Sequence, residues 1–198
     1  MTCKFHTDVN GIPCCWGIEQ NVLEYITSVT KPFHHTLETG AGVSTLTFAK
    51  CGSNHIAISP YTDEFKKITC EAKNQGISLV KVSFIPFKSE RWLPTAMFEH
   101  AFDIVLIDGM HSFPNAIIDW FYTADNLKVG GLLILDDIQM HSVRILYDFL
   151  KSDKPRWGLV NTFNNKTAVF HKISNFVLDV PWHDQPYNKR GVAFWQIL

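Results

Sequence analysis

The chain has 198 residues, a length that favours one domain with a sizeable core. Its 18 Lys and Arg residues are balanced by 19 Asp and Glu residues, so the net charge of -1 disfavours nucleic acid and membranes as partners. Apolar residues make up 46% of the chain, which excludes a disordered protein. Residues 1–8 lack the apolar stretch of a signal peptide, so we expect a cytoplasmic protein.

Short apolar segments alternate with segments of helical period along most of the chain. A first helix is expected around Glu19–Val29, with Leu23 and Ile26 turned inward. Five strand-like runs follow, at Thr36–Glu38, His55–Ser59, Val80–Ile85, Asp103–Asp108 and Leu132–Asp136. Because each right-handed crossover between parallel strands needs a helix, this alternation predicts a parallel sheet covered on both faces.

The segments between these strands carry helix signals. Thr62 or Asp63 can cap a helix that ends before Gly76. Pro114 begins another helix, which Leu127 closes. A last helix is indicated by the apolar positions Val143, Leu146, Tyr147 and Leu150.

The final part of the core departs from this alternation of strands and helices. Leu159–Phe163 and Thr167–His171 are typical of two strands, and Asn164-Asn165-Lys166 between them suits an antiparallel hairpin. We therefore predict an α/β fold with a Rossmann-like, doubly wound, seven-stranded sheet, in which an antiparallel C-terminal hairpin follows five parallel strands. The single domain, 1–198, would have an N-terminal helical segment (1–33), a core (34–173) and a tail (174–198) that could form a lid or a homodimer contact.

The first strand runs into a glycine-containing turn, Leu37-Glu38-Thr39-Gly40-Ala41-Gly42-Val43-Ser44-Thr45. Glycine permits a tight turn and a close approach of the backbone to a ligand, so Gly40→Val is expected to abolish binding and leave the fold intact. A nicotinamide dinucleotide is disfavoured, because Thr45 replaces the third glycine of its fingerprint and no acid follows about 20 residues later. The carboxylate of Glu38 instead suits a cationic amino or sulfonium group. An ordinary glycine turn with a capping serine is the alternative.

Two later strands end in side chains suited to chemistry. One ends in Asp108-Gly109-Met110-His111 and the other in Asp136-Asp137. Ligands of open parallel sheets bind outside the carboxyl ends of the strands, so Glu38, Asp108 and Asp136 are predicted to share one edge. Each acid alone could equally be a helix cap or a solvated loop residue.

Taken in order, these segments resemble class I S-adenosylmethionine-dependent methyltransferases. The match is best to the small-molecule subgroup, which has an Asp-Gly-x-His segment after the fourth strand and paired aspartates after the fifth. The likeness covers about Thr36 to Asp137 and is carried by Leu37–Thr45, Ile107–Pro114, Asp119-Trp120, Leu127–Gly131 and Asp136-Asp137.

The resemblance implies a role for each matching position. Residues that would bind S-adenosylmethionine are Glu38, Thr39, Gly40, Gly42, Ser44, Ser59 and Asp108, with Glu38 near the methionine amino end. Asp108 and His111 would lie beside the acceptor as catalytic residues. The family usually has an acid for the ribose hydroxyls where this chain has Ser59-Pro60. Either Ser59 or a backbone group substitutes, or cofactor affinity is reduced, or activity has been lost.

Methyl transfer to a hydroxyl needs a base or a metal that lowers the pKa of the acceptor. His111 is the natural base, unless it is a structural histidine bonded to a carbonyl. Asp108, Asp136 and Asp137 could instead hold Mg²⁺, because clustered carboxylates need a cation. The sequence therefore favours an O-methyltransferase with a small-molecule acceptor. Its rivals are a catalytically silent binding or scaffold protein and, less favoured, an NAD(P)-dependent oxidoreductase.

Overall fold

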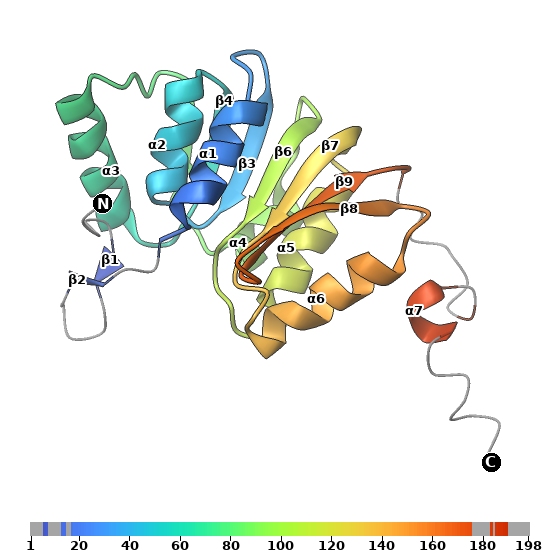
Figure 1. Cartoon of the computed structure of the whole chain (residues 1–198). Helices are drawn as coiled ribbons and strands as arrows, with labels where there is room; N and C mark the ends of the chain where they lie inside the picture. Colours follow the sequence, from blue (N-terminus) through green and yellow to red (C-terminus); the bar gives the residue numbers. More distant parts are fainter. Residues whose placement is uncertain (1–5, 8–12, 15–16, 176–182, 184, 190–198) are drawn as a thin grey trace.

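The core of the protein is one seven-stranded sheet with the strand order β5-β4-β3-β6-β7-β9-β8 (Figure 1). This computed structural model describes residues 6–7, 13–14, 17–175, 183 and 185–189. The strands of the sheet are β3 (His35–Thr39), β4 (Asn54–Ile58), β5 (Val82–Ile85), β6 (Phe102–Ile107), β7 (Leu127–Leu135), β8 (Trp157–Phe163) and β9 (Thr167–Lys172). Strands β3 to β7 are parallel, and β9 is antiparallel to both of its neighbours, so the predicted fold class is confirmed.

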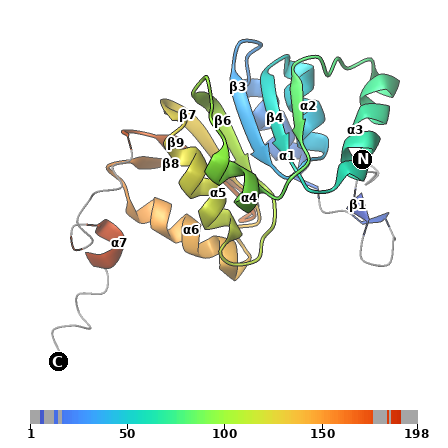
Figure 2. The same cartoon turned by 180° about the vertical axis from the view of Figure 1, so that it is seen from behind.

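Helices lie on both sides of this sheet (Figures 1 and 2). They are α1 (Gln20–Val29), α2 (Val43–Cys51), α3 (Thr62–Gln75), α4 (Ser89–Trp92), the 3-10 helix η1 (Leu93–Thr95), α5 (Asn115–Ala124), α6 (His141–Ser152) and α7 (Pro186–Lys189). None of the helices in the described residues is long and apolar enough to cross a membrane.

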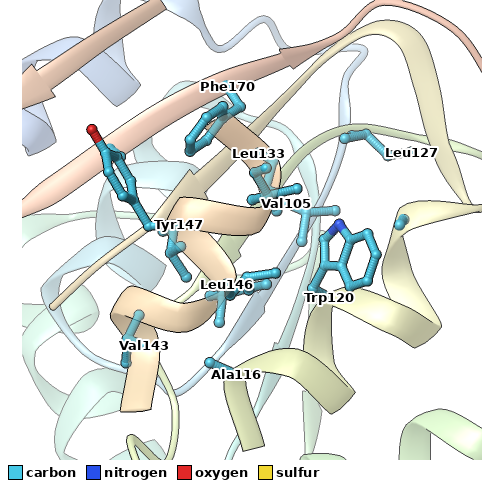
Figure 3. Packing of buried hydrophobic residues seen from close by; sticks show 14 of the residues in the cluster. Val105, Ala116, Trp120, Leu127, Leu133, Val143, Leu146, Tyr147 and Phe170 are labelled. Carbon is cyan, nitrogen blue, oxygen red and sulfur yellow. The ribbon is translucent and has the colours of Figure 1, made fainter. Parts of the chain in front are cut away.

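Alternation along the central strands divides the core into two layers. Val105 of β6 and Leu133 of β7 face α5 and α6 (Figure 3), whereas Ile104 and Ile134 belong to the cluster packed under α1. Successive side chains of a strand point to opposite faces, so a strand buried on both sides is apolar throughout. This explains the unbroken apolar runs that end at the predicted acids.

Three features differ from the sequence predictions. Leu127 begins β7 rather than closing α5, because the strand starts three residues before Gly130 and includes it. The short elements α4 and η1, and a two-residue strand pair, β1 (His6–Thr7) with β2 (Pro13–Cys14), were not predicted. Elements of two to four residues are too short to show a hydrophobic period.

The last strand ties the sheet to the helical layer. The Lys172 side chain of β9 is 1% exposed, and its Nζ donates to the carbonyls of Ala124 at 2.8 Å and Leu127 at 2.7 Å. These contacts satisfy the carbonyl of the last residue of α5, where helical partners end, and that of the first residue of β7. In the described part of the tail, the ring of Tyr187 lies 5.7 Å from that of Phe149 on α6. The rest of the predicted lid or dimer contact lies outside the described residues.

Candidate active site

The strand order reverses between β3 and β6, because the chain runs outward from β3 to β5 and then returns to β6. Such a switch point leaves a crevice at the carboxyl ends of the two strands, where ligands of open α/β sheets bind. Thr39 ends β3 and leads into Gly40 at this position, and Asp108-Gly109 follows β6. The backbone N–H of Asp108 donates to the Thr39 carbonyl at 3.0 Å, so the two strand ends are joined.

Gly40 is required by this junction. Its φ of 94° lies in the left-handed region, and a Cβ added there would lie 2.4 Å from the Asp108 carbonyl oxygen. Space for a ligand is therefore not the only reason for a glycine at this position. The expectation that Gly40→Val leaves the fold intact is wrong, because the new side chain would meet backbone atoms of Asp108 and Gly109, just after β6.

Glu38 lies under the glycine turn and is 1% exposed. Thr45 Oγ1 donates to its Oε1, and His55 Nε2 lies 3.1 Å from the same oxygen. Thr45 Oγ1 also accepts the backbone N–H of Gly42 at 3.0 Å, at the start of α2. The turn is thus capped by Thr45, and Ser44, which is 4% exposed, lies in the first turn of the helix.

Asp108, His111 and Asp137 come together at the ends of β6 and β7. His111 Nε2 lies 3.1 Å from Asp137 Oδ2 and 3.7 Å from Asp108 Oδ1. One potential ligand atom from each side chain lies within 4.8 Å of the others. Burial, together with the charges of Asp136 and Asp137, raises the pKa of Asp108 to about 7. Burial lowers the pKa of His111, but the facing carboxylates outweigh it and leave that pKa above its ordinary value.

Asp136 does not join this cluster, although it was predicted to be a metal ligand. It is 1% exposed, accepts a hydrogen bond from Thr167 Oγ1, and its Oδ2 lies 2.9 Å from Lys166 Nζ. Asp137 turns the other way because its φ of 57° is left-handed, a conformation that Asp adopts more readily than most residues. Lys166 Nζ lies 3.6 Å from Asp137 Oδ1 and so places one positive charge next to the cluster.

The cluster offers two carboxylates and one imidazole. Mg²⁺ prefers oxygen ligands, whereas an imidazole beside carboxylates suits a transition metal such as Mn²⁺ or Zn²⁺. The described residues therefore offer a site for a transition-metal cation at Asp108, His111 and Asp137. They fit such a cation better than the predicted Mg²⁺ on Asp108, Asp136 and Asp137.

Ser59 follows β4 at the same edge of the sheet. Its hydroxyl donates to Glu64 Oε2 at 2.8 Å and accepts the backbone N–H of Tyr61 at 3.3 Å. Glu64 lies in the first turn of α3, so a carboxylate does reach the end of β4 although none stands in the strand. The sequence prediction missed it because the residue is five positions beyond Ser59, across a proline.

Asp119 of α5 was also missed as a candidate. It is 0% exposed, and neither carboxylate oxygen has a hydrogen-bond partner within the described residues. Burial raises its pKa to about 6, while the nearby hydroxyls of Ser89 and Thr39 lower it. Thr39 Oγ1 is buried without a partner as well. An acid at a helix position flanked by apolar residues is the signal that could have indicated this buried carboxyl group.

Exposed apolar side chains stand close in the sequence to the residues of the cluster. Met110 is 50% exposed, Phe113 is 64% exposed and Met140, which precedes α6, is 41% exposed. Ser142 Oγ donates to the His111 carbonyl, which holds the start of α6 beside this loop. Two hollows of about 340 and 350 Å³ are lined instead by residues at the opposite end of the strands, such as Asn54 and Lys128, and neither borders the cluster.

Comparison with known proteins identifies the family of the chain. Residues 37–138 match the family model described as a methyltransferase domain. No curated protein matches the chain.

Solved structures share the fold at low identity. A protein from Staphylococcus aureus assigned as a caffeoyl-CoA O-methyltransferase is 15% identical, with a TM-score of 0.65 over 83% of this chain and 88% of that one. The O-methyltransferase TomG from Streptomyces achromogenes, in complex with SAM, is 12% identical, with a TM-score of 0.64 over 80% and 82%. An rRNA methylase from Streptococcus thermophilus is 14% identical, with a TM-score of 0.61 over 80% and 99%.

Proposed function

The chain belongs to the methyltransferase-domain family of class I S-adenosylmethionine-dependent enzymes, and from this premise we propose that it methylates an oxygen atom of a small molecule. The observation that carries the proposal is the junction of β3 and β6. It brings the glycine turn to the cluster of Asp108, His111 and Asp137. A cofactor on the turn would therefore have its methyl group near a base.

The cofactor residues follow from the polar groups at this edge. We assign the methionine amino end to Glu38, and the turn of Thr39, Gly40 and Gly42 with Ser44 to the rest of the methionine moiety. Ser59 and Glu64 would receive the ribose hydroxyls, since a hydroxyl and a carboxylate 2.8 Å apart can accept both. With this assignment, Glu64 would supply the acid that is missing at Ser59-Pro60. A catalytically silent scaffold is then less favoured as the alternative. TomG, which shares the fold, binds SAM.

A small-molecule acceptor fits the surroundings of the cluster better than RNA. Carboxylates at the reacting edge repel a phosphate backbone, and the net charge of -1 supplies no compensating field. The exposed side chains of Met110, Phe113 and Met140 instead offer apolar contact to an aromatic or aliphatic acceptor. Because one structural neighbour is an rRNA methylase, RNA is the alternative acceptor to be tested.

In the proposed reaction, the imidazole of His111 takes the proton of the acceptor hydroxyl. The acceptor oxygen attacks the methyl carbon, the carbon–sulfur bond breaks, and its electron pair stays on sulfur to give S-adenosylhomocysteine. Asp108 and Asp137 stabilise the imidazolium that forms, because both carboxylates face the same ring nitrogen. The facing carboxylates thus make His111 a stronger base than a free histidine.

A divalent cation is the other possible occupant of the cluster. Asp108, His111 and Asp137 would hold it, and it would stabilise the charge of a deprotonated acceptor. His111 could not then serve as the base, since its Nε2 would be a ligand. A chelator therefore separates the two mechanisms: full methyl transfer with the metal removed favours His111 as the base, and lost activity that Mn²⁺ restores favours the cation.

Calorimetric titration tests the cofactor assignment most directly. S-adenosylhomocysteine should bind and NAD should not, and Glu64→Gln should weaken binding, whereas the exposed neighbour variant Asp63→Asn should not. A panel of phenolic and aliphatic hydroxyl compounds, run beside rRNA fragments with labelled cofactor, tests the acceptor. Methylation of RNA alone would overturn the small-molecule proposal.

A further inference from the structure

Lys166 contacts both members of the acid pair that follows β7. Its Nζ lies 2.9 Å from Asp136 Oδ2 and 3.6 Å from Asp137 Oδ1. The Lys166 side chain is 24% exposed, whereas that of Asp136 is 1% exposed. Burial lowers the pKa of Lys166, but the hydrogen bond to Asp136 and the charges of the nearby acids outweigh it and leave that pKa above its ordinary value. Lys166 therefore brings one positive charge to this edge of the sheet at neutral pH.

The backbone also holds Lys166 in this position. Its N–H donates to the Phe163 carbonyl at 2.8 Å and closes the turn between β8 and β9. Asn164 and Asn165 in this turn have φ values of 48° and 54°, a left-handed conformation that Asn adopts more readily than most residues. The Lys166 carbonyl accepts the N–H of Ile138, just after the acid pair, at 2.8 Å. Lys166 is thus fixed to the segment of the two acids by its main chain as well as by its side chain.

Each carboxylate oxygen of the acid pair already faces a group of the protein. Asp136 Oδ1 accepts the Thr167 hydroxyl, and its Oδ2 accepts the lysine ammonium. Asp137 Oδ1 accepts an N–H of the Gln139 amide at 2.6 Å, and its Oδ2 lies 3.1 Å from Nε2 of His111. A divalent cation on Asp136 would have to displace the ammonium and the hydroxyl. A cation on His111 and Asp137 would share the Asp137 carboxylate with the ammonium.

On the premise of the proposed function, in which His111 is the base, we propose that Lys166 is an internal cation that keeps divalent ions out of the cluster of Asp108, His111 and Asp137. Lys166 acts through the acids and is a positioning residue. Its charge repels a second cation a few ångströms away, which lowers the affinity for a divalent ion by at least about tenfold. An ammonium also balances the acids without occupying a ring nitrogen, so the imidazole of His111 stays free to accept a proton.

Mn²⁺ binding to the free protein tests this exclusion without a measurement of activity. In calorimetric titration, Lys166→Gln should bind Mn²⁺ at least about tenfold more tightly than the wild type, because the charge is gone while the amide can still donate to Asp136. Lys166→Arg keeps the charge and should match the wild type. Lys66→Gln is the matched control, because Lys66 also pairs with an acid, Asp63 at 2.7 Å, but on the exposed face of α3. It should match the wild type as well.

A second substitution locates the cation. Asp137→Asn, added to Lys166→Gln, should remove the gain in Mn²⁺ affinity. Thermal unfolding with and without Mn²⁺ gives an independent measurement, since an ion that binds the folded state raises the unfolding midpoint by mass action. The midpoint should rise in Lys166→Gln and stay unchanged in the wild type. The wild type alone therefore tests the proposal if Lys166→Gln does not fold.

Two outcomes would overturn the role of Lys166. One is a wild type whose unfolding midpoint rises with Mn²⁺, and the other is equal Mn²⁺ affinity in the wild type and Lys166→Gln, whether high or absent. The ammonium would then only fasten β9 to β7, and the methyltransferase activity would still stand, with either mechanism. Failure of the wild type to bind S-adenosylhomocysteine would instead overturn the proposed function, and Mn²⁺ titration would still report on the exclusion.

Discussion

The buried acids of this chain differ in which side chains they face. Glu38 faces His55, Asp136 faces Lys166, and Asp108 shares His111 with Asp137. The protonation of His111 thus depends on two carboxylates at once, which ties the pH dependence of the reaction to both.

His111→Ala should lower kcat by about 100- to 10,000-fold with little change in cofactor affinity, because a general base contributes about that factor. In the wild type, kcat should fall as pH drops through a value above about 6.5, since the protonated ring cannot accept a proton and the carboxylates raise its pKa. Asp137→Asn should move this inflection to lower pH. Measurement of kcat against pH at saturating cofactor checks both, and an unaltered kcat in His111→Ala would remove it as the base.

Asp119→Asn should stabilise the protein at neutral pH. The pKa of Asp119 is about 6 in the folded chain and about 3.9 when unfolded, so the folded state binds more protons between these values and loses stability as pH rises through them. The full cost above pH 6 is about 3 kcal/mol, and the amide does not incur it. Urea unfolding at pH 4.5 and 7.5 should show a clearly larger gain at the higher pH, because only part of the cost is present at pH 4.5. The exposed variant Asp125→Asn should show none, and an equal gain at both values would contradict the argument.

At the scale of elements, the site depends on how strand ends meet. Gly40→Ala should destabilise the protein by more than the approximately 1–3 kcal/mol of a strained backbone alone, because the methyl group also meets the Asp108 carbonyl. Gly76→Ala is a matched control: its φ of 67° is also left-handed, but nothing lies within 4 Å of the added atom. Urea unfolding of the two variants should therefore differ. Similar losses would mean that β3 and β6 can separate without cost.

Lys172→Met should separate β9 from the end of α5. It leaves the carbonyls of Ala124 and Leu127 buried without their donor, which costs about 1–3 kcal/mol for each unsatisfied group. The midpoint of urea unfolding should fall, whereas Lys154→Met, at an exposed lysine, should leave it unchanged. An unchanged midpoint in Lys172→Met would show that water replaces the ammonium at these carbonyls.

At the scale of the whole molecule, the strands, most helices and the family resemblance could be predicted, because each leaves a local pattern or an ordered motif. The order of the strand-like segments was also enough to predict that Asp108 and His111 lie at one edge of the sheet. The roles of Asp136 and Asp137 could not be separated, since neighbouring acids look alike until the backbone of Asp137 turns left-handed. The partners of Glu38 and the burial of Asp119 depend on contacts between distant segments, which a single sequence does not record.

The position of β9 between β7 and β8 has a consequence for the order in which the molecule is completed during synthesis. β8 leaves the ribosome before β9, yet it has no place in the sheet until β9 pairs with β7. Until then, β7 remains an open edge and Asp136 lacks Lys166 and Thr167. The growing chain therefore carries Asp136 before it can bury this acid against its partners. A nascent chain becomes a competent enzyme only when its last strand has been made.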